Sequence, residues 1–190
     1  MGPLSSVEEL LAVLDSGQRM DYLFFWGHQP EPDGRVGKGC LSPWWPVAFT
    51  EAGDTYASAE HYLMAGMARL FGDERLRARI LAAGTPAEAN RLGRQVRGFD
   101  DAAWTIIRFD LAVAANVAKF GQHAELRRYL LSTRDDVLVA ASPQDRVWGI
   151  GMAASDPLVT EPSRWRGLNL LGFALTHARA RLRANSATGR

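Results

Sequence analysis

Two acidic residues with aromatic residues nearby are the positions where this sequence could carry chemistry. Glu60 lies in "SAEHYLMAG", at the expected start of a helix, and Asp145 lies in the irregular loop "ASPQDRVWGIGM", close to Trp148. Carboxylates can exchange protons with a substrate or stabilise positive charge that develops on it. The aromatic faces of Trp104 and Trp148 can stack on a planar ring. The sequence therefore offers an acid-and-aromatic chemistry.

Each of these residues also has a plain structural interpretation. Glu60 could complement the dipole of a helix from its first turn. Asp145 could accept hydrogen bonds from its own backbone in a turn. Trp104 would by default anchor a hydrophobic core. Taken one at a time, the residues do not decide between structure and chemistry.

The two lysines add a second possible chemistry. Lys38 and Lys119 are the only lysines among 22 basic residues, so each is a little more likely than usual to need an amine rather than merely a charge. A desolvated lysine amine can form a Schiff base with a carbonyl group. The alternative is a lysine that binds phosphate or forms a salt bridge. We favour that alternative for Lys119 and leave Lys38 open.

Several other chemistries lack their sequence signatures. The histidines and the single cysteine do not fall in the close paired spacings of zinc sites, so we expect no metal. No G-x-S-x-G nucleophile elbow occurs. Neither the G-x-x-x-x-G-K-[ST] loop nor a G-x-G-x-x-G following a strand is present, so a nucleotide cofactor bound in one of the common folds is not expected.

The elements that must position these residues are mostly helical. Strands are expected at 21–26, 47–50, 55–58 and 137–142, the middle two as a hairpin. Helices are expected at 5–15, 58–70, 72–84, 85–96, 100–120, 123–132 and 168–183. We expect the 72–84 helix to end at Gly84 in the left-handed conformation. Thr85, Pro86 and Glu88 form a capping box with a proline at the first helical position.

Composition sets the class of the protein. Hydrophobic residues make up 47% and charged residues 23%, with a net charge of +1, which gives no general reason to expect polyanion binding. The pattern predicts an α+β fold: a single compact, predominantly helical domain over 1–190 with a few short β-strands. One cysteine, no membrane-length apolar run and no secretory signal favour a cytoplasmic protein without a membrane partner.

Together, the motifs resemble the NADAR superfamily of YbiA-like proteins over about residues 22–183. They occur in the family's order: "FFWG", "LSPWWPVAF", "YASAEHYLMAGMARLFGD", "ILAAGTPAEANRLGR", "GFDDAAW", "NVAKF", "LLST", "ASPQDRVWGIGM" and "RGLNLLG". Ile150 stands where some members carry a third acid, so no role of that acid can be carried over.

The resemblance implies an N-glycosidase that acts on a ribose attached to a nitrogenous base. Two substrate classes are associated with the family: ADP-ribose joined to guanine, including guanine in nucleic acid, and ribosylamino-pyrimidine intermediates of riboflavin synthesis. We favour the first class because the 27–39 loop and the "WGIG" sequence depart from the compact riboflavin-associated form. A non-catalytic ADP-ribose or NAD-binding module and a tryptophan-rich docking protein are the alternatives.

The resemblance also suggests roles for individual residues. Glu60 and Asp145 would be the catalytic carboxylates, with Lys38 as a candidate for a Schiff base on the ring-opened sugar. Gly149 and Gly151 would let backbone N–H groups approach a phosphate or ribose, and Asn169 would complete the site or hold the loop. The expected substrate contacts are Phe25, Trp26, Tyr56, Trp104, Lys119, Trp148, Gly149, Gly151 and Asn169.

Overall fold

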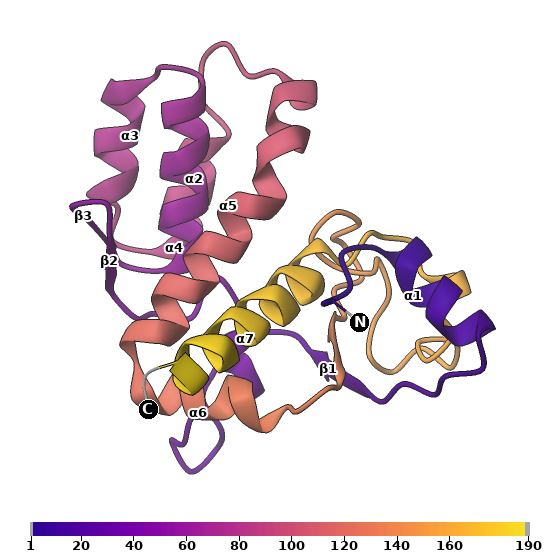
Figure 1. The fold of residues 1–190 in the computed structure, drawn as a ribbon. Helices are drawn as coiled ribbons and strands as arrows, with labels where there is room; N and C mark the ends of the chain where they lie inside the picture. The colour runs from indigo at the N-terminus through magenta and orange to yellow at the C-terminus, as the bar shows by residue number, and fades with distance from the viewer. Residues whose placement is uncertain (1, 189–190) are drawn as a thin grey trace.

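The computed structural model describes residues 2–188 as a mainly helical α+β fold (Figure 1). The helices are α1 Val7–Asp15, α2 Ala59–Leu70, α3 Glu74–Leu81, α4 Pro86–Gly93, α5 Asp101–Gln122, α6 Ala124–Ser132 and α7 Leu170–Thr188. The strands are β1 Tyr22–Phe25, β2 Phe49–Glu51, β3 Asp54–Tyr56 and β4 Val137–Ala140, with short 3-10 turns η1 Lys38–Leu41 and η2 Pro162–Arg164. The predicted fold class is confirmed.

Strands β1 and β4 form a short parallel pair that joins distant parts of the chain. The register sets Tyr22 opposite Val137 and Phe25 opposite Ala140. All four residues of β4 are buried, which explains its continuous apolar run. Because the strands are parallel, their carboxyl ends meet at one edge. The chain leaves that edge at Trp26 on one side and toward the Asp145 loop on the other.

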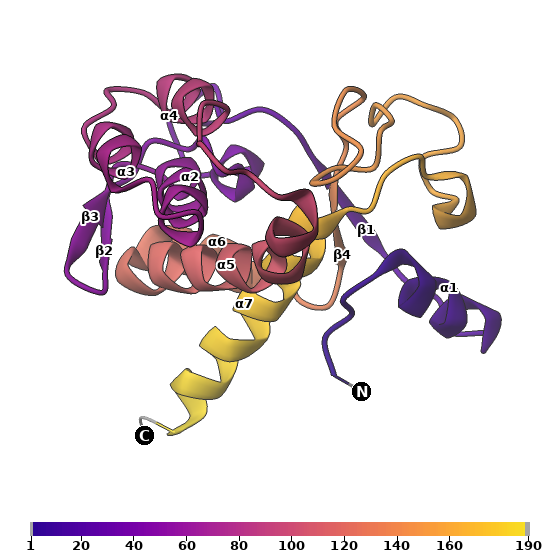
Figure 2. The ribbon, with the colours of Figure 1, turned by 90° about the horizontal axis from the view of Figure 1, so that it is seen from above.

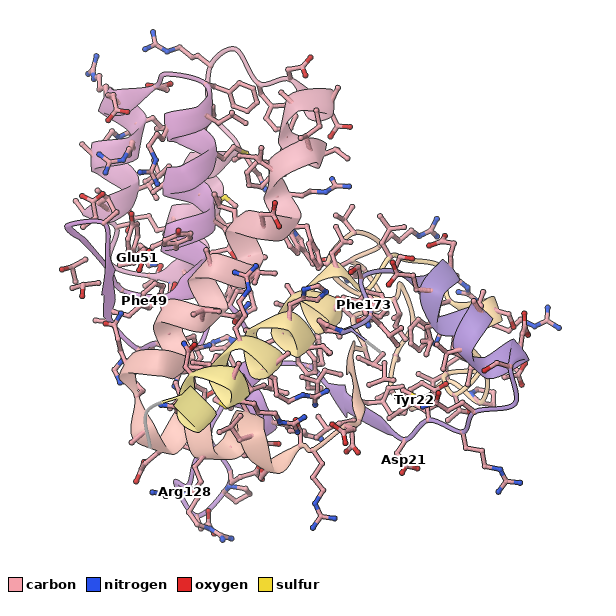
Figure 3. All side chains as sticks on the ribbon, viewed as in Figure 1. Asp21, Tyr22, Phe49, Glu51, Arg128 and Phe173 are labelled. Carbon is pink, nitrogen blue, oxygen red and sulfur yellow. The ribbon has the colours of Figure 1, made fainter. Side chains whose placement is uncertain are left out.

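Strands β2 and β3 form the predicted hairpin. Its turn residues Ala52 and Gly53 have φ angles of 51° and 87°, as a tight two-residue turn with two left-handed positions requires. Phe49 on β2 is 2% exposed and stacks on Tyr56, with 5.7 Å between the ring centroids. Figure 3 labels Phe49 together with Glu51, the exposed residue at the end of the same strand.

Helix α2 is the centre of the helical half of the fold. It packs against α3, α4 and α5, and every residue from Ala59 to Ala68 is buried. From above, α2, α3 and α4 lie on one side, β1 and α1 lie on the other, and α5 and α7 run between them (Figure 2). Helices α5 and α7 are long, yet no helix of the described residues combines the length and apolarity needed to cross a membrane.

The helix ends correct one detail of the sequence analysis. Helix α3 ends at Leu81, and Gly84 is not among the described residues with positive φ, so the expected left-handed glycine end is wrong. The chain instead passes directly into the cap of α4, where the Thr85 side chain accepts from the Glu88 N–H at 3.1 Å. The Glu88 carboxylate accepts from the Gly84 N–H at 3.0 Å, one residue before the cap. The Thr85 half of the predicted capping box is therefore confirmed, whereas the Glu88 half bonds one residue earlier than expected.

Candidate active site

Glu60 is a buried carboxylate held at the start of α2. Ser58 caps the helix, and the Glu60 N–H donates to the Pro43 carbonyl at 3.0 Å. The side chain is 5% exposed, and its Oε1 accepts from Asn90 Nδ2 at 2.6 Å. Burial raises the pKa of Glu60 to about 6, against hydrogen bonds from Asn90 and Trp44 that lower it. A carboxyl with such a pKa is suited to exchange protons near neutral pH.

Asn90 and Arg94 orient this carboxylate, and the sequence analysis missed both. Arg94 Nε donates to Asn90 Oδ1 at 3.2 Å, and because arginine cannot accept, this bond fixes which end of the amide faces Glu60. The available signal was a polar Asn90, unfavourable inside a helix, with an arginine four residues later on the same face of α4. That signal shows a polar face, but it does not show that the face points at Glu60.

Asp145 combines the structural and the chemical interpretations. Its Oδ1 accepts from the backbone N–H groups of Val147 at 2.9 Å and Trp148 at 2.8 Å, which is the expected aspartate turn. Its negative charge also raises the pKa of Glu60. The two acids are far apart in the sequence, but in the structure they lie close enough for their charges to interact. A pair of carboxylates is the arrangement used for proton transfer and charge stabilisation at a sugar carbon.

The loop that carries Asp145 is fixed by close backbone packing. A Cβ on Gly149 would lie 2.7 Å from the Ala140 carbonyl oxygen, so the close approach here is made by the protein's own backbone. Gly151 has a φ of 66°, and its N–H donates to the Asp145 carbonyl at 3.0 Å. These contacts give both glycines a role in closing the loop, whereas we expected them to approach a substrate.

Asn169 holds the same loop against β4. It is fully buried, its Oδ1 accepts from the Ala140 N–H at 2.9 Å, and its Nδ2 donates to the Leu138 carbonyl at 2.9 Å. Its own N–H donates to the Gly149 carbonyl at 3.1 Å. Of the two roles expected for Asn169, these bonds correspond to holding the loop in place.

The two lysines lie in contrasting surroundings. Lys38 is exposed at the first residue of η1. Lys119 is 0% exposed, and its Nζ donates to the carbonyl groups of Cys40 at 2.6 Å and Ser42 at 2.8 Å. Burial lowers the pKa of Lys119 to about 7. The amine of Lys119 therefore faces backbone carbonyls in this conformation rather than an open surface.

The aromatic candidates divide into core and surface residues. Phe25, Tyr56 and Trp104 are 3%, 1% and 8% exposed and belong to the hydrophobic core. Trp26, immediately after β1, is 70% exposed. Trp148 is partly buried and packs against two core clusters. Of these candidates, only Trp26 and Trp148 present part of a ring outside the core. Trp44, in the "SPWWP" segment, was not among the candidates, and its side chain contacts Glu60.

Two cavities lie away from the paired acids. One of about 280 Å³ is lined by the N-terminal segment, β4 and α7, including Leu4, Phe173 and Arg179. The other, of about 520 Å³, lies between the 33–36 loop and α6. Neither includes Glu60 or Asp145, so the candidate site rests on the carboxylates and their partners. Among the described residues, no three histidine, cysteine, aspartate or glutamate side chains gather as a metal would require.

Several known proteins are similar to this chain. The model of the NADAR domain matches residues 24–183. N-glycosidase R617 of Acanthamoeba polyphaga mimivirus is 37% identical over 163 residues, covering 83% of this chain and 94% of the relative. The Vibrio vulnificus riboflavin biosynthesis protein VVA0006 is 34% identical over 121 residues, covering 64% of this chain and 32% of the relative.

A solved structure is also similar. The NMR structure of the Escherichia coli protein YbiA matches with a TM-score of 0.70 and 27% identity, covering 90% of this chain and 89% of that one. In sequence alone, Escherichia coli N-glycosidase YbiA is 33% identical over 138 residues, 73% of this chain and 76% of the relative. The match to the NADAR domain, over residues 24–183, includes both Glu60 and Asp145.

Proposed function

The chain belongs to the NADAR family, and from this premise we propose that it is an N-glycosidase that removes ADP-ribose from ADP-ribosylated guanine, in a nucleoside or in nucleic acid. The observation that carries the proposal is the buried carboxylate of Glu60 beside the charge of Asp145. Relatives named N-glycosidases support the reaction class.

The paired acids fit the demands of the reaction. Breaking a sugar–base bond develops positive charge on the anomeric carbon and ring oxygen, which a nearby carboxylate stabilises. With a pKa of about 6, Glu60 is mostly ionised at neutral pH and can take a proton from the attacking water. The water oxygen then bonds to the anomeric carbon as the bond to the base breaks, and the proton that Glu60 took from the water passes to the departing base, which returns Glu60 to its ionised form. The fixed charge of Asp145 would stabilise the same developing positive charge.

The leaving base needs a flat partner as well as a charge. Trp44 contacts Glu60 directly, and Trp148 follows Asp145 in the same turn. Stacking of a base on an aromatic side chain contributes roughly 1–3 kcal/mol. We therefore assign the base to the space beside these two tryptophans, with its ribose toward the carboxylates.

A ribosylamino-pyrimidine of riboflavin synthesis is the second candidate substrate. The observation in its favour is the similarity to the riboflavin biosynthesis protein VVA0006. Against it stands Ile150, which is fully buried in an apolar cluster with Leu10 and Val139. The 27–39 loop and the "WGIG" sequence that contains Ile150 depart from the compact riboflavin-associated form, which favours ADP-ribosylated guanine.

The test compares substrates and separates catalysis from binding. The protein is incubated in parallel with ADP-ribosylated guanosine, with a guanine-ADP-ribosylated oligonucleotide and with a ribosylamino-pyrimidine, and products are separated by chromatography. Release of ADP-ribose by wild type, and none by Glu60→Gln, is the expected result. Cleavage of the pyrimidine substrate alone would transfer the function to the second candidate. Calorimetric binding of ADP-ribose without cleavage of any substrate would make the protein a binding module.

A further inference from the structure

The amine of Lys119 is enclosed in the fold. The residue lies in the last turn of α5, is 0% exposed, and its Nζ lies 5.0 Å from the centre of the Phe120 ring. An ammonium group removed from water is strongly unfavourable unless hydrogen bonds replace its hydration. Here the carbonyls of Cys40 and Ser42 supply those bonds at 2.6 Å and 2.8 Å. The amine therefore fastens α5 to the segment 40–44.

The segment 40–44 contacts both the backbone and the side chain of Glu60. Ser42, which accepts from Lys119, is followed directly by Pro43, whose carbonyl accepts from the Glu60 N–H at 3.0 Å. The side chain of the next residue, Trp44, lies near enough to the Glu60 carboxylate to lower its pKa as a hydrogen-bond donor. The Trp44 N–H also donates to the Ser42 hydroxyl at 3.1 Å, which closes the turn between the two contacts. A shift of this segment would move both of its bonds to Glu60.

The geometry also explains why the residue is a lysine. Basic positions in this chain are arginines except for Lys38 and Lys119. Two carbonyl oxygens converge on a single point at Nζ, which suits a compact ammonium on a flexible stem. A planar guanidinium spreads its donors over a wider fork and does not match one point of convergence.

We infer that Lys119 is a positioning residue for the Glu60 carboxylate, acting through the carbonyls of Cys40 and Ser42 and the side chain of Trp44. The inference rests on the proposed function for its effect on catalysis. The contact between Trp44 and Glu60, however, can be measured without any substrate. Lys119 itself does not touch the reacting atoms in this account.

The test replaces Lys119 by methionine, which keeps the length of the stem and removes the donors. Arg179→Met is the matched control, because Arg179 is also a buried cation, 4% exposed, that donates to the Asp136 carbonyl at 2.9 Å. That contact lies before the first residue of β4, at the end of the strand opposite to the Asp145 loop. Both variants lose a buried cation, but only Lys119→Met releases the segment 40–44.

The first measurement follows the indole N–H of Trp44 by ¹H–¹⁵N NMR as pH changes, with the signal assigned by its loss in Trp44→Phe. In wild type it should shift with a midpoint near pH 6, as Glu60 titrates, and the absence of this step in Glu60→Gln separates it from the ionisation of Lys119, whose pKa burial lowers to about 7. The shift should be lost in Lys119→Met and retained in Arg179→Met. The second measurement is kcat and KM at a temperature where each variant is folded. Misplacement of Glu60 should lower kcat by about tenfold or more with a smaller change in KM.

The outcomes are decisive in each direction. If Lys119→Met does not fold, Lys119→Gln is measured in the same way, since its shorter amide cannot reach both carbonyls. Wild-type titration of Trp44 and wild-type kcat in either folded variant would overturn the inference, as would a wild-type Trp44 signal that does not titrate with Glu60. Loss of the titration in a protein that cleaves no substrate would leave this inference standing and contradict the proposed function alone.

Discussion

Replacing Glu60 by glutamine should make the protein more stable above pH 7, although it should remove activity. The pKa of Glu60 is raised by burial from 4.5 to about 6. A group whose pKa is raised on folding stabilises the fold fully below its unfolded value, and this contribution is lost as pH rises through the folded value. At about 1.4 kcal/mol for each pKa unit, the ionised Glu60 costs the fold ~2 kcal/mol.

Glutamine does not ionise, so the variant avoids this cost at high pH. Asn90 can still donate to the amide oxygen, whereas the Trp44 indole loses its acceptor at a cost of about 1 kcal/mol at every pH. The difference in unfolding free energy between variant and wild type should therefore change by about 2 kcal/mol between pH 4 and pH 7.5, in favour of the variant at the higher pH.

Urea unfolding of both proteins at the two pH values measures this change. Glu51→Gln is the control, because Glu51 is exposed and its replacement relieves no burial of charge. A difference between Glu60→Gln and wild type that does not depend on pH would refute the reasoning, because Glu60 would then have no raised pKa in the folded protein.

The remaining predictions concern the partners of Glu60 and the lysines. Asn90→Leu removes a hydrogen bond that lowers the pKa of Glu60, so the acid limb of the pH profile of kcat/KM should move to higher pH. Asp145→Asn removes a charge that raises this pKa while its amide oxygen still caps the turn, so the limb should move to lower pH and turnover should fall by about a hundredfold. If the acid limb does not move in Asn90→Leu or in Asp145→Asn, the replaced residue does not act on the pKa of Glu60. Borohydride added during turnover should trap no sugar on the buried Lys119, and mass spectrometry would place any adduct on the exposed Lys38. An adduct on Lys119 would show that the 40–44 segment opens during the reaction.

Local signals in the sequence predicted most of the elements. The helices expected at 58–70 and 85–96 each begin with a residue type that caps helices, and the Ser58 and Thr85 side chains do accept from the backbone three residues later. The hairpin followed from "EAGD", whose glycine accepts a left-handed conformation. In the helix expected at 168–183, Leu171, Leu175 and Leu182 recur at a helical spacing, and all three are buried.

Contacts between distant segments could not be predicted in this way. No local pattern shows that β1 pairs with β4, because the register depends on tertiary packing. The same holds for Asn90, which reaches Glu60 only once α4 packs on α2. Phe25, Tyr56 and Trp104 lie in the core, and their expected contact with the substrate stays a prediction, because an aromatic residue in a motif has the same sequence signal whether it packs in the core or faces a ligand.

The most direct test of the account is the pH dependence of kcat/KM for release of ADP-ribose from ADP-ribosylated guanosine, which reports the ionisation of groups in the free enzyme. The account predicts that the rate falls below a pH of about 6, where Glu60 becomes protonated, and that Glu60→Gln is inactive throughout while still binding ADP-ribose. A profile without an acid limb, together with near-normal turnover by Glu60→Gln, would contradict the central role of this carboxylate.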